Sequence, residues 1–289
     1  MMNEKRMVSA NGLSLPSLGQ GGWHIGNEPR NAQREITALR RGIELGISLI
    51  DTAEMYGDGR SEILIGKTID GIPREEVLLV SKVYPHNAGS PRIFASCDAS
   101  LRRLGTDYLD LYLLHWRGSV PLSETVDCLE QLVSAGKIRR WGVSNFDVAD
   151  MEELMCIPNG KNCAVDQVLY HLGSRGIEYD LLPWLEEHHM AAMAYCPLAQ
   201  AGRLKRMQKE LLSDKTLLCI AQKYEINVFQ LLLAFTQRNP RVVSIPKSGS
   251  PDHVEQNAAV FDISISDEDW TEIDKVFWPP SSKMHLDIE

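Results

Sequence analysis

The stretch Leu109-Asp110-Leu111-Tyr112-Leu113-Leu114 has the length and the apolar character of a buried β-strand. After it, apolar residues recur at helical spacing from Leu122 to Val133, and Gly136 follows where that helix would end. A second strand-like run then occupies residues 141–143. Strand, helix and strand in this order predict a βαβ unit with two parallel strands.

The same alternation continues in both directions along the chain. Short runs rich in β-branched residues alternate with longer segments of helical period, which is typical of α/β folds. Eight parallel strands suit a closed (β/α)8 TIM barrel, although an open doubly wound sheet could also hold them. We find no linker or low-complexity stretch, so we expect residues 1–289 to form a single domain. The predicted strands are residues 17–21, 48–50, 77–81, 109–114, 141–143, 164–169, 191–195 and 242–245.

The start of the chain has a different pattern. Residues 6–9 and 13–15 flank Asn11-Gly12, a dipeptide of tight turns, so we expect an N-terminal β-hairpin before the barrel. Further along the chain, Asn31 and Ser266 stand where they could cap the first turn of a helix.

The composition excludes several classes of protein. The 289 residues carry 30 Lys and Arg against 39 Asp and Glu, a net charge of −9, whereas a nucleic-acid-binding protein needs a basic face. The longest apolar runs are of strand length, far below the roughly 20 residues that span a bilayer. Residues 1–7 contain no apolar run typical of a secretory signal. We therefore expect a cytoplasmic protein that binds neither nucleic acid nor membrane.

The sequence gives no sign of disulfides or of a metal site. The 6 cysteines include no Cys-x-x-Cys pair, so we expect reduced thiols, most of them in the core. His188 and His189 are adjacent, and neighbouring side chains on a helix point apart, so we expect no metal there.

Ionisable or polar residues directly follow several of the predicted strands. Asp51, Lys82 and His115 each stand where a strand ends, and Tyr56 follows Asp51 in the next loop. Because the carboxyl ends of parallel strands open on one face of a barrel, we expect these four side chains to meet there. Each of them alone is more often a helix cap, a solvated charge or a packing residue. Their combination on one face is what points to catalysis.

These four residue types suit the reduction of a carbonyl group. A Tyr hydroxyl is a reluctant acid, and a nearby ammonium lowers its pKa. Lys82 could act on Tyr56 in this way, while Asp51 holds the lysine and keeps it charged. His115 could donate a hydrogen bond to the oxygen that Tyr56 protonates. No side chain supplies a hydride, so a nicotinamide cofactor is implied.

The end of the last predicted strand offers a place for the phosphates of such a cofactor. Lys247 and Ser248 end this strand, and Ser250-Pro251 is a strong start signal for a helix. Helix N-termini attract phosphate through their free N–H groups. With His253 nearby, these residues could form a local basic pocket. Alternatively, a lysine simply lies beside an ordinary capped helix.

The chain resembles the aldo-keto reductase family over nearly its whole length. Within that family it is most similar to bacterial cytoplasmic enzymes that reduce small aldehydes such as methylglyoxal. The resemblance implies a (β/α)8 barrel, NADPH as the cofactor, a small carbonyl compound as the substrate, and a monomer. The segments that carry the likeness are Asp51-Thr52-Ala53-Glu54-Met55-Tyr56-Gly57, Leu109-Asp110-Leu111-Tyr112-Leu113-Leu114-His115-Trp116, Gly142-Val143-Ser144-Asn145-Phe146 and Ile245-Pro246-Lys247-Ser248.

The resemblance also implies roles for individual residues. It implies Tyr56 as the general acid, in a tetrad with the three ionisable residues that follow the strands. The residues implied to hold the nicotinamide are Ser144, Asn145 and Gln167 for its carboxamide, and Tyr195 for stacking on its ring.

The chain departs from the family pattern near the cofactor phosphates. The family usually has Arg where this chain has His253 and Glu where it has Gln256, whereas Asn257 matches. Arg binds phosphate with two hydrogen bonds and is always charged, but an imidazole is mostly neutral at pH 7. We therefore expect a weaker preference for NADPH over NADH than is usual, so that NAD(H) could also serve. Cys196, where many relatives have Ser, is expected to be a buried inert thiol or an oxidation-sensitive one.

Aromatic residues are expected near the mouth of the barrel. Trp23, Tyr84 and Trp116 could form an apolar wall for a short aldehyde or ketone, or could simply pack at the barrel edge. Two other functions stay open. Lys82 could be the Schiff-base nucleophile of an aldolase, although Asp51 would oppose this by stabilising the charged lysine. The chain could also be an NADP(H)-binding redox sensor with little turnover.

Overall fold

The computed structural model describes residues 7–199 and 204–289, and its first element is the predicted hairpin. Strands β1 (Met7–Ala10) and β2 (Leu13–Pro16) pair antiparallel. Residue 6, which we included in the hairpin, lies outside the described residues.

The turn of the hairpin has the backbone conformation that its sequence predicts. Both Asn11 (φ 44°) and Gly12 (φ 79°) are in the left-handed region, as a two-residue turn of this type requires. The Asn11 N–H donates to the His189 carbonyl at 2.9 Å, and its side-chain amide donates to the Cys163 carbonyl at 3.0 Å. Both partners lie just before strands of the barrel, so the hairpin covers the end of the barrel where the strands begin.

The predicted barrel is confirmed. The eight strands are parallel, and each one pairs with the next along the chain. A parallel bridge joins Leu18 to Ser244, and the Ser244 N–H donates to the Ser17 carbonyl at 2.8 Å, so the first strand meets the last. This contact excludes the open sheet. The strands are β3 (Gly19–Gly21), β4 (Leu49–Asp51), β5 (Leu78–Val83), β6 (Leu109–Leu114), β7 (Ile138–Ser144), β8 (Val165–Leu169), β9 (Ala191–Tyr195) and β10 (Val242–Ser244).

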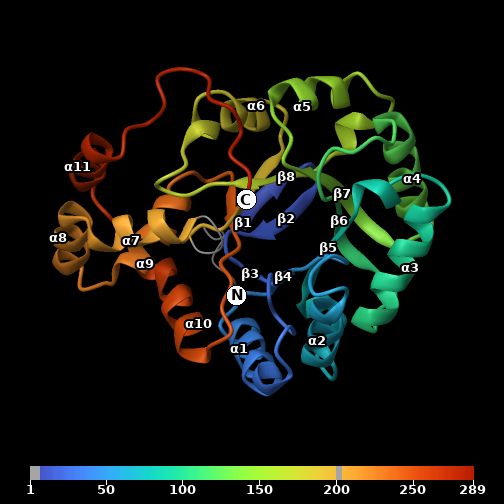
Figure 1. Ribbon diagram of the computed structural model, residues 1–289, viewed down its shortest axis with the longest axis horizontal. Helices are drawn as coiled ribbons and strands as arrows, with labels where there is room; N and C mark the ends of the chain where they lie inside the picture. The colour runs from blue at the N-terminus through green and yellow to red at the C-terminus, as the bar shows by residue number, and fades with distance from the viewer. Residues whose placement is uncertain (1–6, 200–203) are drawn as a thin grey trace.

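The helices surround the strands as an outer ring (Figure 1). Their apolar faces and the outward-facing side chains of the strands form one large core, and a smaller core fills the barrel interior. Short 3-10 turns connect several of these elements. The helices are α1 (Ala32–Glu44), α2 (Arg60–Ile69), α3 (Arg92–Leu104), α4 (Leu122–Ser134), α5 (Val148–Met155), α6 (Leu181–Glu187), α7 (Lys205–Ser213), α8 (Lys215–Lys223), α9 (Val228–Thr236), α10 (Pro251–Ala258) and α11 (Asp267–Val276).

The predicted helix ends are partly confirmed. The Ser266 hydroxyl accepts from the Asp269 N–H and so caps α11, and Gly136 follows α4 with a φ of 72°. The prediction for Asn31 was wrong, because its side chain makes no capping bond. Asn31 ends a 3-10 turn and already has a helical conformation, so its side chain is not placed to reach the N–H groups of α1.

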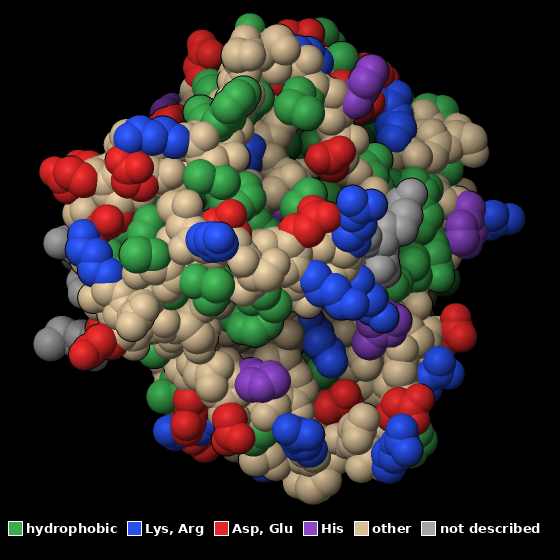
Figure 2. All heavy atoms as spheres, turned by 60° about the vertical axis from the view of Figure 1, so that its left-hand side comes forward, with side chains coloured by type: hydrophobic (Ala, Val, Ile, Leu, Met, Phe, Trp, Pro, Cys, Tyr) green, Lys and Arg blue, Asp and Glu red, His purple; other side chains and the backbone are tan. Residues whose placement is uncertain are grey.

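Within the described ranges, no single helix is both long and apolar enough to cross a membrane; α8 and α9 pass that test only as a pair bent by 91°. On the side of the molecule that Figure 2 shows, basic and acidic side chains are interspersed among apolar ones. This side therefore presents no continuous surface of one charge.

One buried carboxyl group behind the barrel wall predicts a pH-dependent stability. Asp166 on β8 is fully buried, accepts only the Phe146 N–H at 3.5 Å, and has no partner for its second oxygen among the described residues. Burial raises the pKa of Asp166 well above its usual range. The folded state therefore holds a proton that the unfolded chain loses as the pH rises above about 4.

We expect Asp166→Asn to stabilise the protein increasingly as the pH rises. In the wild type, the cost of keeping this group protonated grows by about 1.4 kcal/mol per pH unit between the unfolded-state and folded-state pKa values. The amide carries no such cost. Thermal melts at about pH 5 and about pH 8 should show a larger gain in Tm at the higher pH. An equal change at both pH values would contradict an ionisable origin.

Candidate active site

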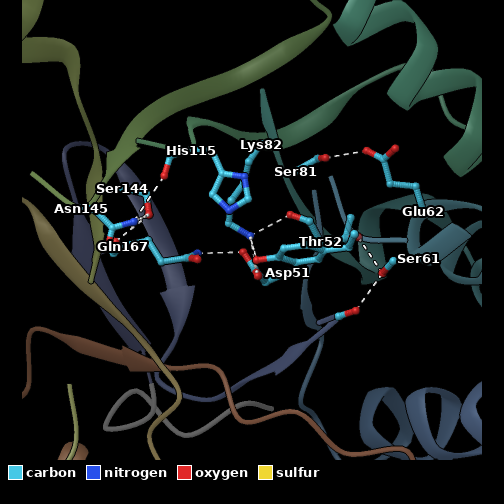
Figure 3. A network of polar contacts seen from close by, with 12 residues as sticks. Asp51, Thr52, Ser61, Glu62, Ser81, Lys82, His115, Ser144, Asn145 and Gln167 are labelled. Atoms are coloured by element: carbon cyan, nitrogen blue, oxygen red, sulfur yellow. Dashed lines mark hydrogen bonds and ion pairs between the residues drawn. The ribbon is translucent and has the colours of Figure 1, made fainter. Parts of the chain in front are cut away.

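The structure brings the four predicted catalytic side chains together at the carboxyl ends of the strands. Asp51 ends β4, Lys82 lies near the end of β5, His115 directly follows β6, and Tyr56 lies in the loop after β4. A cavity of about 490 Å³ opens at this face, and Asp51, Tyr56 and His115 are among the residues that line it. Figure 3 shows Asp51, Lys82 and His115 pointing toward one another from neighbouring strands.

Lys82 is the centre of this group. Its side chain is fully buried, and its Nζ donates to Asp51 Oδ2 at 2.7 Å, to the Thr52 carbonyl at 2.8 Å and to Tyr56 Oη at 3.0 Å. An ammonium has three N–H donors, and here each has an acceptor. Burial lowers the pKa of Lys82, and the carboxylates of Asp51 and Glu62 oppose that effect. The three acceptors are complementary to the charged form of the lysine.

Tyr56 is held with its oxygen at the cavity. The phenol oxygen accepts from Lys82, which leaves its own O–H free to donate, and Trp23 packs edge-on against the ring at 4.8 Å. Burial, and then the Asp51 charge, raise the pKa of Tyr56 well above its usual range. We expected the lysine to lower this pKa, but desolvation of the phenolate is the larger effect, so the pKa lies above its usual range in the protein alone. Because of this high pKa, the phenol stays protonated until it transfers the proton to a stronger base.

His115 lines the same cavity, between Tyr56 and Trp116. Its ring centroid is 5.7 Å from that of Tyr56, and its Nδ1 has no hydrogen-bond partner among the described residues. Burial, and then the charge of Lys82, lower the pKa of His115 to about 2. The imidazole is therefore neutral at physiological pH and can donate one hydrogen bond without carrying a charge.

Three hydrogen bonds that support the tetrad were not predicted from the sequence. Gln167 Nε2 donates to Asp51 Oδ1 at 2.8 Å, so both oxygens of this carboxylate are bonded. The buried Glu62 accepts from Ser81 Oγ and from Arg103 Nε, both at 2.6 Å, and fixes β5 beside Lys82 (Figure 3). Because Glu62 lies on α2, away in sequence from the strand it supports, only the three-dimensional structure reveals this pairing.

The residues implied for the nicotinamide form one wall of the cavity. Ser144 Oγ donates to the Gln167 carbonyl at 2.8 Å, and Asn145 Nδ2 donates to Ser144 Oγ at 3.1 Å. The Tyr195 hydroxyl donates to Asn145 Oδ1 at 2.9 Å. All four side chains line the cavity, and Asn145 holds a left-handed backbone conformation (φ 60°) that turns its amide toward them.

The residues expected at the phosphates are less closely grouped. Lys247 lines the cavity, and Ser248 Oγ accepts from the Ser250 N–H at 3.2 Å. On α10, His253 and Gln256 are exposed, whereas Asn257 is buried. None of these three α10 residues is among those that line the cavity.

The start of α10 differs in one respect from our expectation. The Ser250 side chain forms no capping bond, although Pro251 opens the helix as predicted. Instead, the Ser250 hydroxyl accepts a hydrogen bond from the Arg34 guanidinium at 2.9 Å. Arg34 lies on α1, far from the phosphate segment in sequence, and so was not among the predicted site residues.

The mouth of the cavity is partly aromatic. Trp23 and Trp116 line it. Tyr84 is not among its lining residues, because it stands edge-on behind Trp116 at 5.9 Å and stacks on His86 at 4.9 Å.

The C-terminal segment also reaches this cavity, which sequence patterns did not indicate. Ile288 and Glu289 line it, and Asp287 accepts from Ser174 Oγ at 2.6 Å, which anchors the segment. In Figure 1 this segment returns from α11 to the centre of the barrel. Cys196 lines the cavity as well; burial, and then the charge of Glu289, raise its pKa to about 12, which favours the protonated thiol.

The family of the chain follows from comparison with known proteins. A profile of the aldo/keto reductase family matches residues 17–277. The chain belongs to this family. It is therefore an oxidoreductase, and Asp51, Tyr56, Lys82 and His115 lie at the carboxyl ends of the barrel strands, the face that carries the active sites of TIM-barrel enzymes in general.

Individual relatives agree with this assignment. The chain is 51% identical to methylglyoxal reductase YeaE of Escherichia coli (strain K12), over 99% of this chain and 100% of that protein. It is 34% identical to glyoxal reductase of Bacillus subtilis (strain 168), over 91% and 90% of the two chains. A crystal structure of an aldo-keto reductase from Klebsiella pneumoniae in complex with NADPH superposes with a TM-score of 0.95 at 50% identity, covering 99% of this chain and 100% of the other.

Proposed function

We propose that this aldo/keto reductase uses NADPH to reduce small aldehydes and ketones, and 2-oxoaldehydes such as methylglyoxal in particular. The observation that carries the proposal is the Lys82 ammonium, which donates to Tyr56 Oη at 3.0 Å at the edge of the cavity. A neutral carbonyl oxygen that becomes an alkoxide needs a proton donor and hydrogen bonds at that point. Residues 1–289 would act as one domain.

The cavity fits the nicotinamide end of the cofactor. Amide and hydroxyl groups of Ser144, Asn145 and Gln167 line one wall and match a carboxamide, and Tyr195 offers a ring for stacking. Lys247 also lines the cavity and offers a cation for a phosphate. When bound, the cofactor supplies the hydride. NADP(H) is the proposed cofactor, with NAD(H) as a weaker substitute.

The tetrad handles the proton. Tyr56 donates its proton to the substrate oxygen, and Lys82 stabilises the phenolate that forms, because its N–H already points at that oxygen. Asp51 keeps Lys82 charged and in place, and Gln167 fixes Asp51 from the opposite side. His115, neutral at physiological pH, donates a hydrogen bond to the same substrate oxygen and orients it.

The size and lining of the cavity favour a short substrate. Trp23 and Trp116 stand at its mouth beside the C-terminal residues Ile288 and Glu289, so a substrate of a few carbon atoms would be enclosed. Two similar proteins act, by their names, on methylglyoxal and glyoxal, which are 2-oxoaldehydes. The Schiff-base alternative is disfavoured, since a lysine that donates three hydrogen bonds has no lone pair for attack.

The proposal is tested by following NADPH oxidation with a panel of aldehydes, ketones and 2-oxoaldehydes. We expect kcat/KM to be highest for 2-oxoaldehydes and lowest for bulky ketones. Tight NADPH binding without turnover on any carbonyl compound would favour the redox sensor instead. We expect a cytoplasmic monomer, which gel filtration and cell fractionation can check.

A further inference from the structure

We propose that Arg34 on α1 is a cofactor-specificity residue, whose guanidinium provides the second fixed positive charge for the 2′-phosphate of NADPH. This inference rests on the proposed function, because it concerns the cofactor of that same site. Among the residues that follow β10, sequence reasoning identified Lys247 and found His253 where an Arg is usual. In the structure, the guanidinium of Arg34 on α1 reaches the start of α10.

The position of Arg34 is fixed by a contact with the phosphate segment. Its Nη2 donates to Ser250 Oγ at 2.9 Å, across 216 positions of sequence. Helices α1 and α10 lie side by side, as Figure 1 shows, and this brings Arg34 to the start of α10. Because the Ser250 hydroxyl accepts from Arg34 and forms no capping bond, its own proton remains available for a phosphate oxygen.

Charged side chains pack closely around the short turn between Lys247 and Ser250. A Cβ placed on Gly249 would lie 3.3 Å from Glu35 Cγ and 3.7 Å from Lys247 Nζ. The Lys247 ammonium and the Glu35 side chain therefore both lie close to the backbone of this turn. Lys247 and Arg34 then flank the same short turn, one from its own strand end and one from α1.

The local charges show why a second cation matters. The Glu35 carboxylate is buried beside this turn and accepts the Gly26 N–H at 2.9 Å, and Asp252 lies in the first turn of α10. Against these two carboxylates, Lys247 alone would leave a net negative charge beside a phosphate that itself carries about two negative charges. An imidazole, unlike a guanidinium, is not a permanently charged group, so His253 does not supply a fixed charge here. The Arg34 guanidinium balances the two carboxylates together with Lys247, since a guanidinium is charged at every physiological pH.

The consequence is a change in the expected cofactor preference. From His253 alone we expected a weak preference for NADPH. With Arg34 at the turn, we expect a strong preference that does not depend on His253. NADH has no 2′-phosphate, so its binding should not depend on Arg34.

The test compares the binding of NADPH and NADH, measured as quenching of tryptophan fluorescence, because Trp23 and Trp116 line the cavity. We expect Arg34→Gln to raise the Kd for NADPH by about tenfold or more, in line with the loss of a charged hydrogen bond, and to leave the Kd for NADH within about twofold. Adenosine 2′,5′-bisphosphate, as a competitor, should lose affinity by the same factor as NADPH. Arg34→Lys should recover part of the loss.

Arg41→Gln is the matched control. Arg41 lies on the same helix and also contacts α10, but it bonds to Glu255 at 2.8 Å and to Glu44 at 3.1 Å. We expect no change in either Kd for this variant. If Arg34→Gln weakened both cofactors equally, or if only His253→Ala weakened NADPH, the assignment of Arg34 would be overturned. If the wild type bound neither cofactor, the proposed function itself would fail.

Discussion

Tyr56→Phe should lose most of its turnover and keep its cofactor. We expect kcat for the reduction of 2-oxoaldehydes to fall by about 10²–10⁴-fold, the range that a general acid contributes. The Kd for NADPH should stay within about twofold, because the variant removes one oxygen and leaves the ring packed against Trp23. Steady-state kinetics and fluorescence titration measure the two quantities on the same preparation.

The loss should come from the missing proton donor rather than from a disturbed fold. In Tyr56→Phe, Lys82 loses one of its three acceptors, but Asp51 and the Thr52 carbonyl still hold it. Tyr108→Phe is the matched control, because Tyr108 precedes β6 at the opposite end of the barrel, where its ring packs under Arg74. We expect wild-type kinetics for this control. Tyr56→Phe with more than a tenth of wild-type kcat would show that another group protonates the product.

The barrel and the tetrad were predictable because both depend on patterns within single elements. A strand such as β6 reveals itself by its apolar run, and its C-terminal neighbour His115 must then lie at the catalytic face. Because the neighbouring strands run parallel to β6, Asp51 and Lys82 must lie on the same face as His115. The sequence could not show how these residues are joined, because the three hydrogen bonds that the Lys82 ammonium donates are visible only in the structure.

What the sequence did not predict depends on contacts between distant elements and on solvation. The Arg34–Ser250 bond and the Gln167–Asp51 bond each join elements more than a hundred positions apart, and no local pattern links them. The net increase in the Tyr56 pKa was not foreseen for a related reason. A neighbouring charge can be inferred from topology, whereas burial depends on every atom packed around the phenol.

The Lys82→Met substitution should damage both activity and stability. The variant removes the charge that stabilises the Tyr56 phenolate, so we expect kcat to fall by about 10²–10³-fold. It also leaves the carboxylate of Asp51 buried at 2% exposure without its cation, which we expect to cost about 3–5 kcal/mol of unfolding free energy. Chemical denaturation and steady-state kinetics give the two numbers.

Adding Asp51→Asn to Lys82→Met separates these two effects. The double variant buries no unpaired charge, so we expect most of the lost stability to return. Activity should not return, since the phenolate still lacks its cation. The side-chain amide introduced by Asp51→Asn can still accept the hydrogen bond that Gln167 donates, so the wall for the nicotinamide stays in place and the Kd for NADPH should remain close to that of the wild type. A double variant that regained both stability and turnover would mean that Lys82 serves only to neutralise Asp51, and the proton transfer we assign to Tyr56 would then proceed without help from a buried ammonium.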